Sequence, residues 1–440
     1  MKRNNAVLLP VLVLCGINIL NFYDRNAPGA LVEPMRREFG LSDTQIGLLG
    51  SAFVWIYALA GVPLGRVADV WSRKRLLAFG VLVWTALTAL AAFAGSYSVL
   101  LFSRLGVGVG EAICAPAGTS WLGDLFPVNR RARVLAIFML GVPVGGALSY
   151  FFSGPIAQAW GWRTAMVVAA LPAVLLVPAL LTLHEPERGA SEARDSEARH
   201  LGPQKAPLEK LSTWSVLRIP TLWWIIASGI FLNFNMYAIG TFMPAFLSRV
   251  HGMSLARSGV ATGCTYLIGG VCGGLLAGGV GDRIVRTHHN GRLLIASGIA
   301  LLAAPFAYLG VVQRPGDVLL TLVFLTLAYG AFNTYYGLVY ASIQDIVPAN
   351  QRGFTMAIYF MAMYLCGASF GPLLTGNLSD RMARRAMALA GAQTMTEPFK
   401  ATGLQQAMLI IPALSVALAI VLYFGSRTIS GDIARRQGVA

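Results

Sequence analysis

Long apolar stretches recur from one end of the chain to the other, separated by short polar segments. Each is long enough to cross the ~30 Å hydrocarbon core of a membrane as a helix of about 20 residues. Twelve such helices are predicted, over residues 7–33, 44–67, 76–95, 98–122, 133–158, 163–183, 219–247, 255–280, 292–312, 318–345, 354–379 and 403–425. The pattern therefore predicts an all-α membrane protein with twelve transmembrane helices.

One long polar stretch, residues 185–217, interrupts this pattern near the middle of the chain. It mixes charges of both signs with Gly and Pro, which is the composition of a linker. We therefore predict an N-terminal six-helix bundle over residues 1–184, a cytoplasmic linker over 185–217 and a C-terminal six-helix bundle over 218–440.

The two predicted bundles repeat one another in sequence. Residues 124–138 and 345–359 align at a constant offset of 221 through Asp, Pro, Asn, Arg, Ala and Ile. Repeated halves are a known way to build a central site that opens to either side of a membrane. The repeat thus predicts two related halves around such a site.

Composition and charge narrow the class of protein. The chain is 56% hydrophobic and 12% charged, against about 25% charged residues in soluble domains. Its net charge of +15 is compatible with nucleic-acid binding, but twelve crossings place 22 of the 34 Lys and Arg residues inside and ten outside. This asymmetry follows the positive-inside rule with both termini cytoplasmic. We expect a monomer in the bilayer of a bacterial inner (cell) membrane, with no nucleic-acid partner.

Four charged residues lie inside the predicted helices away from their ends: Asp24 and Arg25 in the first, and Arg104 and Glu111 in the fourth. A charge near the middle of a membrane-spanning helix costs at least about 2.5–3.5 kcal/mol. Such residues usually move a proton or an ionic solute, so the four charges indicate a transporter.

Asp24 and Glu111 are the candidate proton-coupling groups. A buried carboxyl group favours its protonated form and a nearby arginine favours the charged form, so moving the arginine away captures a proton. Arg104 and Glu111 are two helical turns apart and can line one cavity, whereas the adjacent Asp24 and Arg25 cannot point the same way. Either of these two can face the fourth helix. The alternative is a structural salt-bridge cluster between the two helices, although buried ion pairs stabilise poorly.

Polar and aromatic residues follow single stripes of two helices in the second half. Asn233 and Tyr237 lie one turn apart, and Asn333 and Tyr336 lie in the stripe of the tenth helix. Such side chains offer hydrogen bonds from an apolar wall, which suits a small solute with an ionic head and an apolar body. The alternative is that these rings only pack helices together.

No catalytic or phosphate-binding motif and no metal-ligand spacing is present, so we expect no enzymatic activity, no metal and no cofactor. The coupling ion expected is the proton. The residues predicted to bind the substrate are Arg104, Arg25, Asn21, Asn233, Tyr237, Asn333 and Tyr336.

The loop at residues 65–75 reads Gly-Arg-Val-Ala-Asp-Val-Trp-Ser-Arg-Lys-Arg, and a partial copy follows at 278–283. With twelve helices in two related halves, this loop resembles the signature of the major facilitator superfamily. The resemblance implies a latch in which the glycine allows close helix approach and the Asp pairs with the Arg or caps a helix. Its residues would be Gly65, Asp69, Arg73, Asp282 and Arg283. An ordinary basic loop is the alternative.

Within that superfamily the chain resembles the spinster family of lysolipid and sphingolipid carriers. Residues 21–25 match the family's Asn-x-x-Asp-Arg, and residues 103–112 followed by Gly-Asp-Leu-Phe at 123–126 match its fourth helix. This implies a proton-coupled carrier of an amphipathic anion, such as a lysophospholipid or sphingoid lipid. The anion:cation symporter family, which carries sugar acids, shares both helix motifs and is the alternative; the Gly-Asp-Leu-Phe ending favours spinster.

Overall fold

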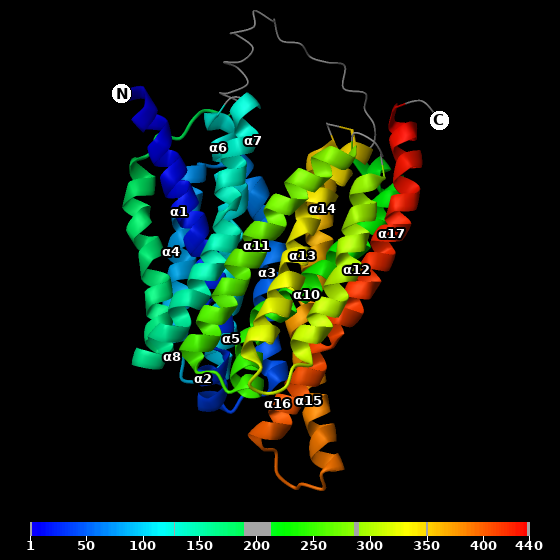
Figure 1. Ribbon diagram of the computed structural model, residues 1–440. Coiled ribbons are helices and arrows are strands. Elements are labelled where there is room, and N and C mark those ends of the chain that lie inside the picture. Colours follow the sequence, from blue (N-terminus) through cyan, green and yellow to red (C-terminus); the bar gives the residue numbers. More distant parts are fainter. Residues whose placement is uncertain (1, 127, 189–212, 286–289, 349–350, 438–440) are drawn as a thin grey trace, which may run out of the picture. The chain divides into compact units, whose positions relative to one another are not determined.

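The computed structural model describes residues 2–126, 128–188, 213–285, 290–348 and 351–437 (Figure 1). Within these ranges the chain is helical and holds no β-strand. Eleven helical stretches among the described residues are long and apolar enough to cross a membrane. The longest, Ile137–Thr182, contains two spans, because Gly161 has φ 84° and ψ 156° and interrupts the helix. The predicted all-α class with twelve spans is confirmed.

Contacts between Cα atoms divide the chain into two compact units. Unit 1 comprises residues 1–28 and 55–210, and unit 2 comprises residues 29–54 and 211–440. The helices α1 (Lys2–Ala30) and α3 (Asp43–Val70) each contain residues of both units. The bundle and linker boundaries expected from the sequence stay predictions.

Unit 1 is built around α4, which packs against α5 and α8. Its large buried side chains include Trp84 of α4, Trp121 of α6 and Tyr150 of α8. Besides parts of α1 and α3, the unit contains α4 (Arg73–Ala92), α5 (Tyr97–Glu111), α6 (Cys114–Leu125), α7 (Val128–Met139) and α8 (Gly141–Thr182).

Unit 2 places α13 against α11 and α12, and α17 against α10 and α12. Its α15 and α16 form a hairpin (Figure 1). The unit contains α2 (Val32–Phe39), the 3-10 helix η1 (Thr213–Arg218), α10 (Pro220–His251), α11 (Leu255–Val285), α12 (Gly291–Val311), α13 (Val318–Ile346), α14 (Arg352–Ala362), the π-helical turn η3 (Met363–Ala368), α15 (Phe370–Leu389), α16 (Glu397–Met408) and α17 (Ile410–Gln437).

Both units expose large apolar side chains along their helices. Leu175 of unit 1 and Leu275 and Leu319 of unit 2 are each 73–75% exposed. Extended apolar surfaces of this kind are unfavourable in water and suit a hydrocarbon surrounding.

Candidate functional site

The four predicted intramembrane charges lie buried together in unit 1. Asp24 and Arg25 come from α1, and Arg104 and Glu111 come from α5; none is more than 9% exposed. Arg25 donates a hydrogen bond from Nε to Glu111 Oε2 at 3.1 Å. The charge of Arg104 interacts with those of Asp24 and Glu111. The structure thus brings all four residues into one electrostatic cluster.

The adjacent residues Asp24 and Arg25 reach different helices. Thr88 of α4 donates from its hydroxyl to Asp24 Oδ2 at 2.6 Å, whereas Arg25 reaches Glu111 on α5. The sequence left open which of the two faces this helix; in the structure Arg25 donates to Glu111 of α5, and Asp24 interacts with the charge of Arg104 on the same helix. Thr88 was missed from the sequence; a polar residue within the apolar helix 76–95 is the signal that could have identified it.

Aromatic rings cover the guanidinium of Arg25. Its Cζ lies 4.5 Å from the ring centroid of Phe22 and 4.3 Å from that of Tyr57. Asn21, the first residue of the motif, accepts a hydrogen bond from Arg25 Nη2 at 3.4 Å. Each cation–π contact is worth about 0.5–2 kcal/mol. Arg25 is therefore held by a carboxylate, an amide and two rings, and Tyr57 is a second contact that the sequence motif did not reveal.

The backbone fixes the position of Glu111. The helix predicted over residues 98–122 continues past this carboxylate, because Ala112 and Ile113, which separate α5 from α6, both keep right-handed helical dihedral angles. Pro116 has no N–H to donate to the carbonyl of residue 112, so one hydrogen bond of the helix is missing just after Glu111. Close packing adds to this: a Cβ on Gly110 would lie 2.8 Å from the backbone nitrogen of Trp84. Glycine at 110 therefore lets α5 approach α4 closely.

In unit 2 the predicted residues Asn233 and Tyr336 contact one another. The Tyr336 hydroxyl donates to Asn233 Oδ1 at 3.4 Å, and Asn233 Nδ2 donates to Met363 Sδ at 3.2 Å. Asn333 instead donates to the backbone oxygen of Tyr329 in its own helix at 2.8 Å. The stripe on α13 therefore has a polar contact to α10 at Tyr336.

Tyrosine rings surround this contact. Tyr237 packs edge-on against Tyr364, with ring centroids 6.3 Å apart, and Tyr336 packs against Tyr340 at 5.6 Å. Met363 and Tyr364 lie in the π-helical turn η3, and such turns are frequent at functional sites. We call Asn233, Tyr237, Tyr336, Tyr340, Met363 and Tyr364 the aromatic wall. Met363 and Tyr364 carry no sequence signal, because a π-helical turn has no distinctive pattern.

The predicted latch residue Arg73 begins α4 and is fully buried. It forms ion pairs with Asp124 of α6 and with Glu185, the latter at 3.2 Å from Nε to Oε1. Its Nη2 also donates to the backbone oxygen of Pro186 at 2.6 Å. The side chain of Asp69, its predicted partner, lies outside the described residues. The close helix approach expected at Gly65 stays a prediction.

Glu185 caps the first turn of α4. Its carboxylate accepts from the Ser72 hydroxyl at 2.7 Å and from the backbone N–H groups of Arg73 and Lys74 at 2.8 and 3.3 Å. Burial alone raises the pKa of Glu185, but the hydrogen bonds from Ser72, the two N–H groups and the Arg73 side chain outweigh it and hold the pKa below its ordinary value. This carboxylate therefore stays charged at neutral pH and ties the chain after α8 to α4.

A corresponding pair lies in unit 2. Arg292 near the start of α12 contacts Asp345 of α13 at 2.5 Å, and Asp345 is the repeat equivalent of Asp124. Arg436 of α17 donates to the backbone oxygen of the same Asp345 at 2.6 Å. The side chains of Asp282 and Arg283, predicted for the second latch, lie outside the described residues. The sequence repeat thus recurs as an Arg–Asp pair in each unit.

Comparison with known proteins finds a family and relatives that match most of this chain. A family model described as Major Facilitator Superfamily matches residues 14–372. An MFS-type efflux pump of Mycolicibacterium smegmatis is 30% identical over 413 residues, which cover 94% of this chain and 90% of the pump. Protein spinster homolog 1 of Bos taurus is 28% identical over 401 residues, which cover 86% of this chain and 74% of the homolog.

Solved structures show the same likeness. A crystal structure of a bacterial homolog to the human lysosomal transporter spinster, in an inward-facing and unoccupied conformation, superposes with a TM-score of 0.86 at 25% identity. The superposition covers 97% of this chain and 98% of that one. A D-xylose-proton symporter is similar in fold, with a TM-score of 0.72 at 17% identity over 94% of this chain and 96% of the symporter.

Proposed function

The chain belongs to the major facilitator superfamily, and on that premise we propose that it carries an amphipathic anion by alternating access, coupled to protons. The resemblances to the superfamily and to the spinster family are confirmed by the family match and the relatives. These proteins are transporters and not enzymes. The chain is a multi-pass membrane protein.

The observation that carries the proposal is the buried pair of Arg25 and Glu111. A buried ion pair stabilises a protein poorly, because desolvation of both charges offsets their attraction. Breaking such a pair by removing one charge is costly, since the other charge is left uncompensated. A second anion that replaces Glu111 beside Arg25 would remove that cost.

This competition provides the coupling. When Glu111 takes up a proton, it loses the charge that holds Arg25, and Arg25 becomes available to the anionic head of the substrate. When Glu111 loses the proton, it competes with the anion for the same guanidinium. Proton and anion therefore bind together and leave together, with no part required beyond these two side chains.

Asp24 and Arg104 have further roles in the proposed coupling of proton and anion. Asp24 is held by Thr88 and interacts with the charge of Arg104, so it forms a second proton-titrating candidate within the same cluster. Arg104 offers a planar fork to a phosphate or carboxylate. We assign the substrate's anionic group to Arg25 and Arg104.

The aromatic wall supports the amphipathic part of the proposal. Tyr237, Tyr336 and Tyr340 present rings in T-shaped contact, and Asn233 adds a polar group to a largely apolar surface. Such a surface suits an acyl or sphingoid chain. Spinster homologs among the relatives support a substrate of this kind.

The alternative is a proton symporter for sugar acids of the anion:cation symporter type. The four buried charges support sugar-acid transport as much as lysolipid transport, because a sugar carboxylate would bind Arg25 and Arg104 in the same way. The two substrates differ in the apolar body, which only the lysolipid possesses.

A thermal-shift titration of purified protein in nanodiscs separates the two. Lysophosphatidylglycerol and glucuronate, which are anions, are compared with monoacylglycerol and glucose, which carry no charge. A ligand at 100 times its Kd stabilises the folded state by about 2.7 kcal/mol. We expect stabilisation by lysophosphatidylglycerol well above that by monoacylglycerol, and its loss in Arg104→Gln.

Glucuronate as the sole stabilising ligand would establish the sugar-acid alternative. Equal shifts with lysophosphatidylglycerol and monoacylglycerol would contradict recognition of the anion. Arg257→Gln, an exposed arginine of α11, is the matched control and should respond as the wild type does.

A further inference from the structure

The helix α15 is the last part of a helical stretch that is too long for the membrane. This stretch, Arg352–Leu389, has 38 residues, or about 57 Å at 1.5 Å per residue. The hydrocarbon core is only ~30 Å thick, so at least one end of the stretch must lie outside it. Figure 1 shows the end of α15 as one arm of its hairpin with α16. The topology predicted from the charge asymmetry places this hairpin on the outside.

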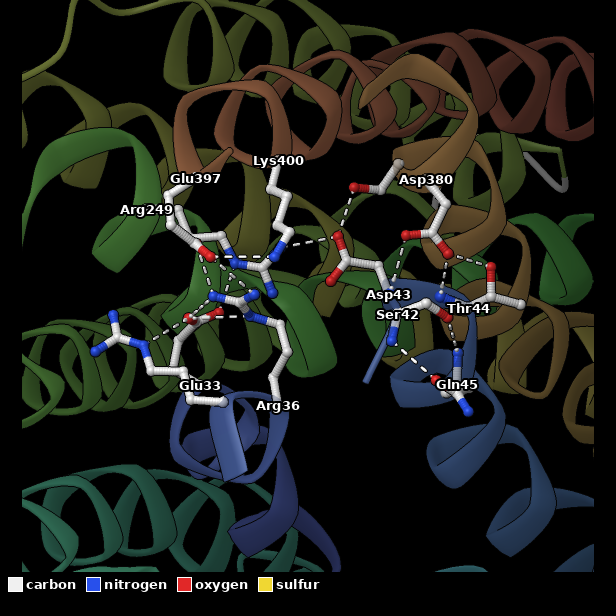
Figure 2. A network of polar contacts seen from close by, with 12 residues as sticks. Glu33, Arg36, Ser42, Asp43, Thr44, Gln45, Arg249, Asp380, Glu397 and Lys400 are labelled. Atoms are coloured by element: carbon white, nitrogen blue, oxygen red, sulfur yellow. Dashed lines mark hydrogen bonds and ion pairs between the residues drawn. The ribbon is translucent and has the colours of Figure 1, made fainter. Parts of the chain in front are cut away.

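Polar contacts at the ends of several helices fix the level of the membrane surface on α15 (Figure 2). Asp380 accepts from the backbone N–H groups of Asp43 and Thr44 at 3.0 and 2.9 Å, and the apolar stretch of α3 starts at Asp43. Arg249, near the end of α10, contacts the same Asp43 at 2.8 Å. Charge is costly in the middle of a membrane. Asp380 therefore lies near the level at which these helices leave the hydrocarbon.

Three arginines follow Asp380 within five residues. They are exposed and carry no other element between them and the surface: Arg381, Arg384 and Arg385. Five helical residues span at most about 7.5 Å, and the polar headgroup region is about 5–7 Å deep on each side of the hydrocarbon. The three guanidinium groups therefore start from backbone at the level of the lipid headgroups.

The arginines lie away from the packed side of α15. Ala383 is 4% exposed, and a Cβ on Gly403 of α16 would lie 2.7 Å from its backbone nitrogen. Arg381 and Arg385 are each two residues from Ala383, about 200° around the helix, so they lie on the opposite face. Leu374, two turns before Arg381 on that face, is 46% exposed. The face thus changes from apolar to basic along its length, as a surface against a lipid would.

The protein supplies no counter-charge to this cluster. The carboxylates closest to it are engaged elsewhere, because Asp380 accepts from α3 and Glu397 of α16 contacts Arg36 and Lys400 at 2.8 and 3.1 Å. None of the three arginines forms an ion pair within the described part of the chain. Three positive charges on the predicted outer side also depart from the positive-inside rule. An external anion at this position would compensate them.

We propose that Arg381, Arg384 and Arg385 form a binding site for the phosphate of an anionic diacyl phospholipid in the outer leaflet. Arginine matches phosphate with a planar fork of donors, and the apolar face at Leu374 lies where the acyl chains would run. Each arginine beside an anionic membrane surface should raise the affinity roughly fivefold. The site is separate from the buried charges of unit 1 and goes beyond the proposed function.

Native mass spectrometry of the full chain in detergent tests the site, with Kd measured for the first bound dioleoyl phosphatidylglycerol and dioleoyl phosphatidylcholine. We expect the parent to bind phosphatidylglycerol at least about tenfold more tightly. Replacing Arg381, Arg384 and Arg385 together by glutamine should remove most of this preference, whereas replacing them by lysine keeps the charge and should keep most of it. The matched control is Arg257→Gln with Arg314→Gln, which removes two exposed arginines elsewhere in unit 2.

An equal ratio of the two Kd values in the parent and in the glutamine variant would overturn the site. An equal loss in the lysine and glutamine variants would also overturn it, because charge would then not be the cause. Arg104→Gln should keep the preference; a preference lost in Arg104→Gln and kept in the glutamine variant would place the diacyl lipid at the buried charges instead. Failure of lysolipid transport would overturn the proposed function and leave this ratio unchanged.

Discussion

Arg25 and Glu111 form a buried ion pair between α1 and α5, with Nε and Oε2 3.1 Å apart and the side chains 5% and 0% exposed. The pair joins residues 86 positions apart in the chain, in a part of the protein where water does not screen charge. Whatever changes the charge of Glu111 therefore changes what Arg25 can bind, and the proposed coupling follows from this one contact.

Neutralising Glu111 should remove the pH dependence of anion binding. Glu111→Gln keeps the size of the side chain and imitates its protonated form, so Arg25 stays available at every pH. Asp24→Asn should flatten the profile in the same way if Asp24 shares the proton. The measurement is the Kd for lysophosphatidylglycerol between pH 5 and pH 8. Glu38→Gln, an exposed residue of α2, is the control, and a wild-type profile in both test variants would place coupling elsewhere.

The two arginines should respond differently to replacement by lysine. Arg104→Lys keeps the charge but loses the planar fork, and losing one charged hydrogen bond costs about 1.5–3 kcal/mol, roughly ten- to a hundredfold in affinity. Arg25→Lys should mainly move the pH profile, because Arg25 contacts Glu111 directly. Both quantities come from the same binding titrations. A lower affinity in Arg25→Lys with an unshifted pH profile would contradict the role of Arg25 in proton coupling.

Glu185 should contribute to stability at neutral pH. Glu185→Gln weakens its hydrogen bonds to α4 and its ion pair with Arg73, which should cost about 1–3 kcal/mol of unfolding free energy. The pKa of Glu185 is lower in the folded than in the unfolded chain, so its contribution is complete above the unfolded value of about 4.3 and is lost as pH falls through the lower folded value. Tm measured from pH 7 down to pH 3.5 should show the gap between wild type and variant closing at the acid end.

Glu187→Gln is the matched control, since Glu187 is an exposed residue two positions further along the chain. It should leave Tm unchanged over the whole range. A gap between wild type and Glu185→Gln that stays constant down to pH 3.5 would show that the charge of Glu185 is not the source of the stability.

The aromatic wall should matter for the apolar body of the ligand. Tyr336→Phe removes the hydrogen bond to Asn233 and should lower lysolipid affinity by a modest factor, about two- to tenfold. Tyr336→Ala also removes the ring and should weaken long-chain ligands more than short-chain ones. Kd values for lysolipids of two chain lengths measure this. Tyr308→Phe, at a position 51% exposed, is the control, and a chain-length effect equal in both positions would contradict the assignment.

Much of this fold is predictable from sequence, because apolar stretches of sufficient length identify membrane helices directly. The cost of a buried charge likewise identified Asp24, Arg25, Arg104 and Glu111 without any structure. The contacts that Arg25 and Asp24 make with other helices could not be predicted from the sequence. They depend on the rotation of α1 about its own axis, and the order of two adjacent residues does not determine that rotation.

Other contacts could not be predicted from the sequence for a similar reason. Arg73 pairs with Asp124, which lies in α6, and with Glu185, which follows α8, and the three become neighbours only through packing. The assignment of residues 29–54 to unit 2 rests on contacts more than 200 positions apart in the chain, such as that between Glu33 and Arg249. No local pattern encodes such contacts, whereas helices and buried charges are local properties.

The central claim is that proton and anion move together through the Arg25–Glu111 pair, and proton flux in proteoliposomes tests it most directly. Protein is reconstituted into vesicles that contain a pH-sensitive dye, and lysophosphatidylglycerol is added outside without any other gradient. We predict a pH change inside wild-type vesicles, none with monoacylglycerol, and none in Glu111→Gln. Lysolipid uptake by the wild type with no accompanying pH change, or an equal pH change in Glu111→Gln, would contradict the account.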